Sequence, residues 1–345
     1  MLLVVFGAGA SYDSAPAYPP GLADGDRPPL SNQLFENRPR FADALVSFYE
    51  CQPLVPRLRQ PSEGVTIEHL LEEYQAQTTD YPQRYKQLAA TRYYLHFVLW
   101  EVGNYWRNTH KGVTNYKTLL DDLERWRQRA SEKICLVTFN YDKILESALP
   151  VLGIDIRDLA GYISNDNYKI IKIHGSVDWG HEVETTIDLE NKNQWEIAHE
   201  LIDKAAVLKF SNRYHIVDSH PIAFGVYGTD SRRTPLFPAI ALPVVKKSAF
   251  ECPDEHLNVL RESLPRVSEI LTIGWRGNEE HFLALLRQEL KHPPRMMIVA
   301  NDEDGANQIG SDLMRVGIGR NFVAAKGGFS STIRSGEIDV FLRPE

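Results

Sequence analysis

The chain has 345 residues, which is enough for one large domain or two ordinary ones with a full apolar core. Hydrophobic residues make up 43% and charged residues 24%, as in ordinary globular proteins, and the formal net charge of −8 argues against direct binding of nucleic acid. The three cysteines, Cys51, Cys135 and Cys252, are far apart and form no C-x-x-C pair, which indicates a reducing compartment and predicts no bound metal.

The chain opens on the apolar run "MLLVVF", which has no positively charged segment before it and ends at Gly7. This pattern predicts the first strand of the fold and not a signal peptide. No run of about eighteen apolar residues follows, so we expect no contact with a membrane and a cytoplasmic location. The stretch 13–30 is rich in proline, glycine and aspartate and predicts a long loop, which could serve as a lid.

A helical region is predicted from 31 to 130. Thr66 is a candidate N-cap, and the residues after it recur at helical spacing on one face: Ile67, Leu70, Leu71 and Tyr74. A long, aromatic-rich helix follows. Its residues are apolar on all faces, so we do not expect it to be exposed to solvent. We expect this region to be an insertion packed on the sheet. Its segment 81–106 has two readings, a self-association surface or core packing.

Strands and helices then alternate. Apolar strands are predicted at "KICLVTF", "YKIIKIH", "PAIALPVV", "EILTIGW" and "RMMIVAN", with helices at "YDKILESALPVL" and "NEEHFLALLRQEL" and a polar insertion at 181–233. Such alternation predicts an α/β fold, a doubly wound, mostly parallel, Rossmann-like sheet. We expect a single domain over 1–345 that carries both insertions. "PAIALPVV" can also be read as an edge strand bounded by proline.

Polar or glycine residues follow five of the predicted strands. In a parallel sheet the carboxyl ends of the strands share one edge, where ligands bind, so these residues are candidates for one site. They are Gly7, Ala8, Gly9 and Ser11; Thr138, Asn140, Tyr141 and Asp142; His174 and Gly175; Gly274 and Arg276; and Asn301.

Each candidate has an ordinary structural reading when it is taken alone. The G-x-G of Gly7 and Gly9 lets a phosphate approach the backbone, but it also makes a plain tight turn, and Tyr12 stands where a third glycine would be. Asn140 could be a helix N-cap, and His174 a buried core histidine.

Taken in order, the motifs GAG-x-S, T-x-N-x-D and H-G, followed by "LTIGW" and "VAND", resemble the sirtuin family over roughly 1–25, 133–180 and 235–305. The resemblance implies a sirtuin-type fold and NAD as the bound substrate. By this likeness, the glycine turn and Ser11 line the pyrophosphate, Asn140 and Asp142 lie at the nicotinamide ribose and carboxamide, and His174 is the base. Breaking the nicotinamide–ribose bond suits a histidine that titrates near neutrality.

Two departures refine the resemblance. Sirtuin deacetylases carry a four-cysteine zinc module after H-G, whereas 175–273 holds only Cys252, and Trp275-Arg276 replaces the serine expected after the "IG" strand. The chain is therefore more similar to divergent prokaryotic sirtuin-like proteins that hydrolyse NAD in antiphage defence. That resemblance implies an NAD⁺ glycohydrolase that releases nicotinamide and ADP-ribose, a homo-oligomer, and an ATPase or helicase-type partner. The alternatives are a protein deacylase and a non-catalytic NAD-binding assembly subunit; a dehydrogenase is disfavoured.

Overall fold

The computed structural model describes residues 1–16, 26–184, 187, 189–217, 226–227, 234–244 and 250–343. Residues 17–25 of the predicted 13–30 loop lie outside this set. The chain forms two compact units: the first contains 1–28, 105–174 and 254–345, and the second contains 29–104 and 175–253.

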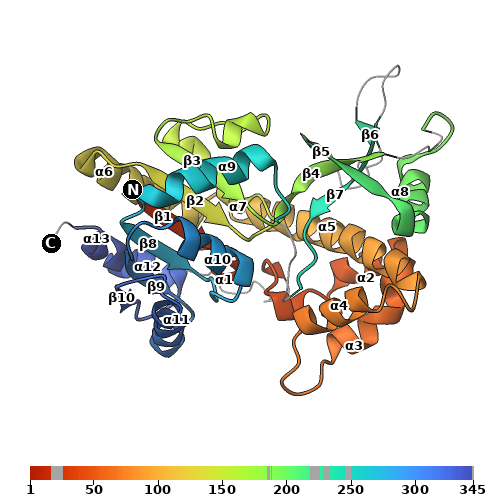
Figure 1. The fold of residues 1–345 in the computed structure, drawn as a ribbon, viewed down its shortest axis with the longest axis horizontal. Coiled ribbons are helices and arrows are strands. Elements are labelled where there is room, and N and C mark those ends of the chain that lie inside the picture. The colour runs from red at the N-terminus through yellow and green to blue at the C-terminus, as the bar shows by residue number, and fades with distance from the viewer. Residues whose placement is uncertain are drawn as a thin grey trace. The chain divides into compact units, whose positions relative to one another are not determined.

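The first unit is built on a six-stranded parallel sheet (Figure 1). Its strands lie in the order β10-β9-β8-β1-β2-β3. Their bounds are β1 Leu2–Phe6, β2 Ile134–Thr138, β3 Tyr168–Lys172, β8 Glu269–Ile273, β9 Arg295–Val299 and β10 Asn321–Ala324. β1 and β2 are buried at every residue, because helices cover both faces of an inner parallel strand.

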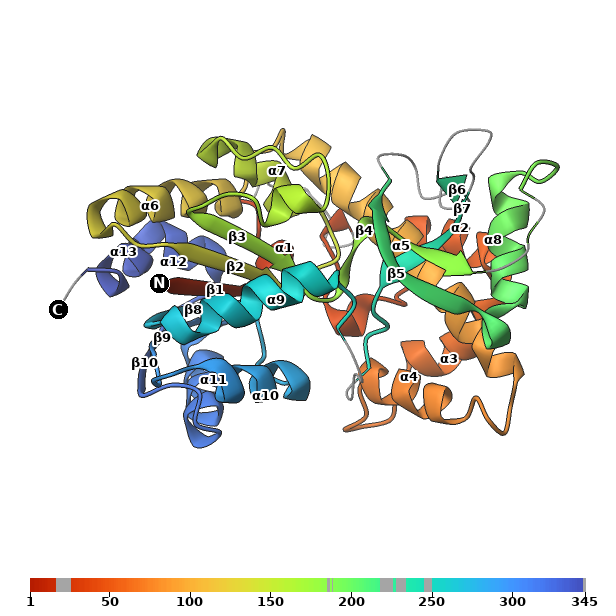
Figure 2. The same ribbon diagram turned by 45° about the horizontal axis from the view of Figure 1, so that its top comes forward.

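Helices lie on both faces of this sheet (Figure 2). One face carries α6 Asn115–Ala130, α7 Ile144–Ala148, α12 Phe329–Ser335 and α13 Glu337–Phe341; the other carries α9 Asp254–Ser263, α10 Glu280–Glu289 and α11 Glu303–Arg315. Short helical turns complete the unit at α1 Ala8–Tyr12, η4 Leu149–Leu152, η5 Ala160–Tyr162 and η8 Leu264–Arg266. The prediction of a doubly wound, Rossmann-like α/β fold is confirmed. The N-terminal run is the strand β1 at the centre of the sheet.

The strand order places a topological switch between β1 and β8. From β1 the chain adds β2 and β3 on one side; it later returns to β8, on the other side of β1, and continues to β9 and β10. Crevices at the carboxyl ends of strands form where the order reverses in this way. The switch therefore marks the edge of the sheet at which a ligand is expected.

The second unit has an antiparallel sheet that the sequence did not reveal. Its order is β5-β4-β7-β6, with β4 Gly175–Glu184, β5 Lys209–Ile216, β6 Val226–Tyr227 and β7 Thr234–Ile240. β7 contains the first three residues of the "PAIALPVV" run, which was assigned to the parallel sheet; that assignment is wrong, because this part of β7 pairs antiparallel with β4. The edge-strand reading of this run stays a prediction, since Pro238 and Ile240 pair with β4 while β6 pairs with β7 only at Thr234 and Pro235.

The helices of the second unit come from 29–104 and from the segment after β4. They are η2 Ser31–Gln33, α2 Pro39–Ser47, η3 Tyr49–Leu54, α3 Val55–Arg59, α4 Ile67–Ala76, α5 Gln83–Thr109, α8 Gln194–Asp203 and η6 Ala205–Val207. Thr66 caps α4, since its side chain accepts the His69 N–H, and the predicted face of that helix is buried. The predicted insertion boundaries differ from the structure, because α6 lies in the first unit and the second unit includes β4 and β7. The single-domain expectation stays a prediction.

The aromatic segment 81–106 serves core packing. Tyr93, Tyr94 and Trp106 are each no more than 2% exposed, and Tyr93 packs edge-on against Phe237 of β7 at 5.1 Å between ring centroids. For these three rings, the prediction of core packing is confirmed, and the prediction of a self-association surface is not tested. Among the described residues, no helix combines the length and the apolar character needed to cross a membrane.

Candidate active site

The predicted site residues other than Gly175 lie at one edge of the first unit's sheet, where the strands share a common register. Five strands pair along one row: Lys172, Thr138, Phe6, Ile273 and Val299. The residues two positions beyond that row are His174, Asn140, Ala8, Trp275 and Asn301. Asn140 and His174 therefore follow neighbouring parallel strands at equivalent positions. The structure brings together the strand ends that the sequence singled out, while their chemical roles stay predictions.

At the switch between β1 and β8, the two backbones touch through glycine. A Cβ on Gly7 would lie 2.4 Å from the Gly274 carbonyl oxygen, and Gly274 has a φ of +61° that favours glycine. The Gly7 and Gly9 N–H groups donate to the carbonyls of Ile273 (3.0 Å) and Gly274 (3.2 Å). Close packing thus explains these glycines, and both N–H groups are used within the chain. Contact with a pyrophosphate stays a prediction.

Asn140 links the ends of β1 and β2. Its Nδ2 donates to the Gly7 carbonyl (2.9 Å), to Ser11 Oγ (3.0 Å) and to Tyr116 Oη (3.2 Å). A carbonyl only accepts, so the atom facing Gly7 must be the nitrogen of the amide. The backbone N–H of Asn140 donates to Thr138 Oγ1 at 3.0 Å. Asn140 is therefore a structural bridge as well as a candidate catalytic residue, and its N-cap reading is not seen.

Tyr116, on α6, completes this network and was not predicted. Its hydroxyl lies 3.2 Å from Ser11 Oγ, and burial, reinforced by Asp142, raises its pKa. The phenol therefore stays protonated and acts as a neutral partner. In the sequence, Tyr116 belongs to a run with helical apolar spacing, so it looks like an ordinary core residue.

His174 lies against the turn that follows β2. Its ring meets Phe139 edge-on at 4.8 Å between centroids and lies nearly parallel to Tyr141 at 6.1 Å. Phe139 in turn stacks on Trp275 at 5.6 Å with an interplanar angle of 9°. His174 is buried, and two aromatic rings of the turn after β2 pack against its imidazole. Histidine held this way at a sheet edge suits proton transfer.

Asp142 shapes the start of α7. Its Oδ1 accepts the Ile144 N–H at 2.9 Å, and its backbone carbonyl accepts from Lys172 Nζ at 2.5 Å. Lys172 also pairs with Glu146 Oε1 at 2.7 Å. Sequence reasoning missed this pair, although a lysine inside a fully buried strand was a signal that could have found it.

The remaining candidates differ in placement. Arg276 and Asn301 are exposed at their strand ends, and Asn301 Nδ2 donates to Asp302 Oδ2 at 3.1 Å. Gly175 belongs to the second unit, where its φ is +81° and a Cβ would meet the Ala239 carbonyl oxygen at 1.9 Å. Close approach to β7 therefore explains Gly175, and its role at a ligand stays a prediction.

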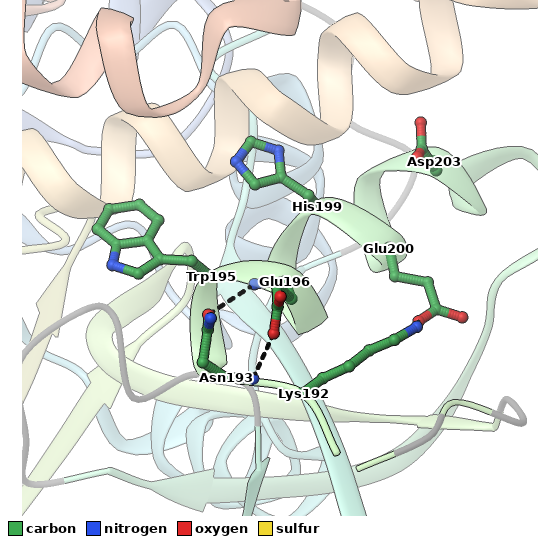
Figure 3. A pocket seen from close by; sticks show the side chains of 7 residues that line it. All are labelled: Lys192, Asn193, Trp195, Glu196, His199, Glu200 and Asp203. Atoms are coloured by element: carbon green, nitrogen blue, oxygen red, sulfur yellow. Dashed lines mark hydrogen bonds and ion pairs between the residues drawn. The ribbon is translucent and has the colours of Figure 1, made fainter. Parts of the chain in front are cut away.

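A hollow in the second unit lies along α8 (Figure 3), and none of these residues lines it. Its acidic side chains already have partners: Glu196 caps the helix, Glu200 pairs with Lys192 and Lys204, and Asp203 pairs with Lys86. We assign it no role. Of the described residues, no group of three or more histidine, cysteine or acidic side chains has the arrangement of a metal site.

The first unit thus has the fold of Rossmann-like α/β proteins, with polar side chains gathered at the carboxyl edge of the sheet. No family model and no curated protein matches the sequence. Solved structures similar to the chain include Sir2 bound to an acetylated peptide (13% identity) and Sir2Tm bound to a propionylated peptide (14% identity). Each comparison covers 99% of this chain and 94% of the other, with a TM-score of 0.38.

Proposed function

We propose that the chain is an NAD⁺ glycohydrolase that cleaves the nicotinamide–ribose bond with water. The observation that carries the proposal is the shared register of Asn140 and His174, two residues beyond the paired Thr138 and Lys172 at the carboxyl edge of the sheet. The glycine contact of Gly7 and Gly274 lies at the switch point of the same sheet. Dinucleotides bind Rossmann-type sheets at such an edge.

The reaction places simple demands on the site. The electron pair of the C1′–N bond goes to the pyridinium nitrogen, which leaves as neutral nicotinamide, while positive charge develops on the ribose. Water then adds at C1′ and releases one proton. His174 accepts that proton, since imidazole titrates near neutrality.

Asn140 has the complementary role of placing the nucleophile. Its Nδ2 is already engaged with three oxygens, so the group that it offers a ligand is the acceptor Oδ1. An acceptor at this position orients a water molecule or a ribose hydroxyl through the hydrogen that it binds. The carboxylate of Asp142, buried in the same turn, adds negative charge on the side where the ribosyl cation forms.

The test is a product assay on the purified chain. NAD⁺ is incubated alone or with an acetyl-lysine peptide, and nicotinamide, ADP-ribose and acetylated ADP-ribose are separated by chromatography. We expect equal amounts of nicotinamide and ADP-ribose with no need for peptide. Release of nicotinamide only with peptide would identify a deacylase, and NAD⁺ binding without any release would identify a non-catalytic subunit.

The biological part of the proposal is an antiphage effector that depletes NAD⁺. It would act as a homo-oligomer in the cytoplasm and be switched on by an ATPase or helicase-type partner, as the resemblance to divergent prokaryotic sirtuin-like proteins implies. Cells expressing the parent chain with its neighbouring genes should lose NAD⁺ on infection, whereas cells expressing His174→Gln should not. Unchanged NAD⁺ in both strains would contradict this role.

A further inference from the structure

Lys172, the last residue of β3, is a fully buried lysine. Its side chain is 0% exposed, in a strand whose neighbours Ile170 and Ile171 are apolar. An ammonium group taken out of water is costly unless charged or polar partners replace the solvent. The position therefore calls for an explanation other than packing.

The ammonium has two partners on the segment that follows β2. Nζ donates to the backbone carbonyl of Asp142 at 2.5 Å and to Glu146 Oε1 at 2.7 Å. Glu146 is 7% exposed and also accepts the Tyr162 hydroxyl at 3.0 Å. One cation thus ties β3 to the turn and to α7.

These bonds fix the turn after β2, which carries two of the proposed catalytic residues, Asn140 and Asp142. Asn140 is held at the start of the turn by Thr138 and the Gly7 carbonyl, and Asp142 is held at its end by Lys172. His174 follows Lys172 by two residues on the same strand end. The position of the turn relative to His174 therefore depends on the lysine.

We propose that Lys172 is a positioning residue, which with Glu146 sets the Asn140 turn against His174 without touching substrate. This inference rests on the proposed function. Stability alone does not require the pair, because uncharged side chains of similar volume often replace a buried ion pair at no cost. A displacement of about 1 Å in a catalytic group, in contrast, can lower the rate on the order of 100-fold.

The experiment compares Lys172→Met, the double variant Lys172→Met/Glu146→Gln, and the control Lys169→Met. Lys169 lies on the same strand, half-buried, with its Nζ on the Ile163 carbonyl. Lys172→Met leaves Glu146 buried without its cation, so its Tm should fall. The double variant contains no unpaired charge, so its Tm should return to near the parental value.

We expect kcat for NAD⁺ cleavage to stay roughly 10- to 100-fold lower in the double variant, with KM nearly unchanged. Lys169→Met should keep the parental kcat. A double variant that regains both Tm and kcat would show a purely structural pair and overturn the proposal.

A second readout does not depend on catalysis. Hydrogen exchange of peptides covering 139–147 should be faster in the double variant at equal Tm, and unchanged in Lys169→Met. If the parent releases no nicotinamide, the proposed function fails, and exchange alone decides the role of Lys172. In that case, hydrogen exchange in the double variant at the same rate as in the parent would overturn the positioning role of Lys172.

Discussion

At the scale of single residues, the amide of Asn140 donates to three oxygens of the site, so its substitution acts on folding as well as on activity. Asn140→Ala leaves the Gly7 carbonyl and two hydroxyls without that donor. These acceptors keep other partners, since the Gly7 carbonyl also accepts the Ala10 N–H and the Ser11 and Tyr116 hydroxyls bond each other, so the loss is that of ordinary hydrogen bonds at about 0.5–1.5 kcal/mol each. We expect the free energy of unfolding to fall by at least that much, measured by urea denaturation.

A matched control for this variant is Asn307→Ala. Asn307 is exposed on α11, so its removal should change stability by less than about 0.5 kcal/mol. Nothing in the sequence identifies Tyr116 as a partner of Asn140, so this effect on folding could be predicted only from the structure. An Asn140→Ala variant as stable as the control would show that the three hydrogen bonds contribute nothing.

His174→Gln tests the proposed base. The side chain keeps a polar group but cannot accept the proton, and loss of a general base lowers rates about 10²- to 10⁴-fold. Because Asn140 and His174 serve one transition state, the double variant should be scarcely slower than the slower single variant. Nicotinamide release and thermal melts are measured together. Folded His174→Gln protein with parental activity would exclude the role.

The thiols of Cys51 and Cys135 should be unreactive in the folded protein. Both are fully buried, and burial raises the pKa of each to about 12. In the unfolded chain a thiol ionises near pH 9, whereas in the fold these two thiols stay protonated up to about pH 12. Ionisation therefore favours the unfolded chain above pH 9, and the stability that the two thiols contribute is lost as pH rises from about 9 to 12. At pH 8, mass spectrometry should find neither residue alkylated before denaturation and both alkylated after it. Rapid native labelling would contradict their burial.

At the scale of elements, the sequence predicted five of the six strands of the first unit, all but the edge strand β10, and did not predict the second sheet. Strands such as "LLVVF" and "ICLVT" are buried on both faces, so they appear as continuous apolar runs. β5, in contrast, is a half-exposed edge strand with charged residues, which resembles a polar loop. Partner choice is also invisible locally: the apolar β7 looks like a parallel strand although its neighbours are antiparallel.

The contact between β1 and β8 gives a prediction for one element boundary. Gly7→Ala would place a Cβ 2.4 Å from the Gly274 carbonyl oxygen and 2.7 Å from Trp275 Cα, which the backbones can relieve only by moving apart. Overpacking of this kind costs about 1–3 kcal/mol. Gly161→Ala, whose nearest atom would be 3.4 Å away, is the control for urea unfolding. Equal stability of the two variants would refute the packing role of Gly7.

At the scale of the whole molecule, the division of the chain into units was the feature least available from sequence. The sequence suggested insertions at 31–130 and 181–233, whereas the second unit contains 29–104 and 175–253. One boundary falls inside the uninterrupted helix α5, and another falls directly after His174. A single glycine stands beside each boundary, Gly103 and Gly175, but neither place has the proline-rich or extended polar run that usually separates domains. Boundaries of this kind depend on tertiary packing.

The last prediction, also at this scale, is that the fold needs no zinc. Cys51, Cys135 and Cys252 are each buried, and none of them forms a disulfide in the part of the chain that is described. Several histidines already use a ring nitrogen: His199 with Glu50, His215 with Glu182, and His256 with the Leu159 carbonyl.

A structural zinc contributes on the order of 10 kcal/mol to folding, so its removal would lower Tm drastically. We expect protein treated with a chelator to keep its Tm and to hold far less than one zinc per chain by elemental analysis. Stoichiometric zinc, or a chelator-induced loss of the fold, would refute this and revive the deacylase alternative, whose peptide channel is framed by a four-cysteine module in the family that the motifs resemble.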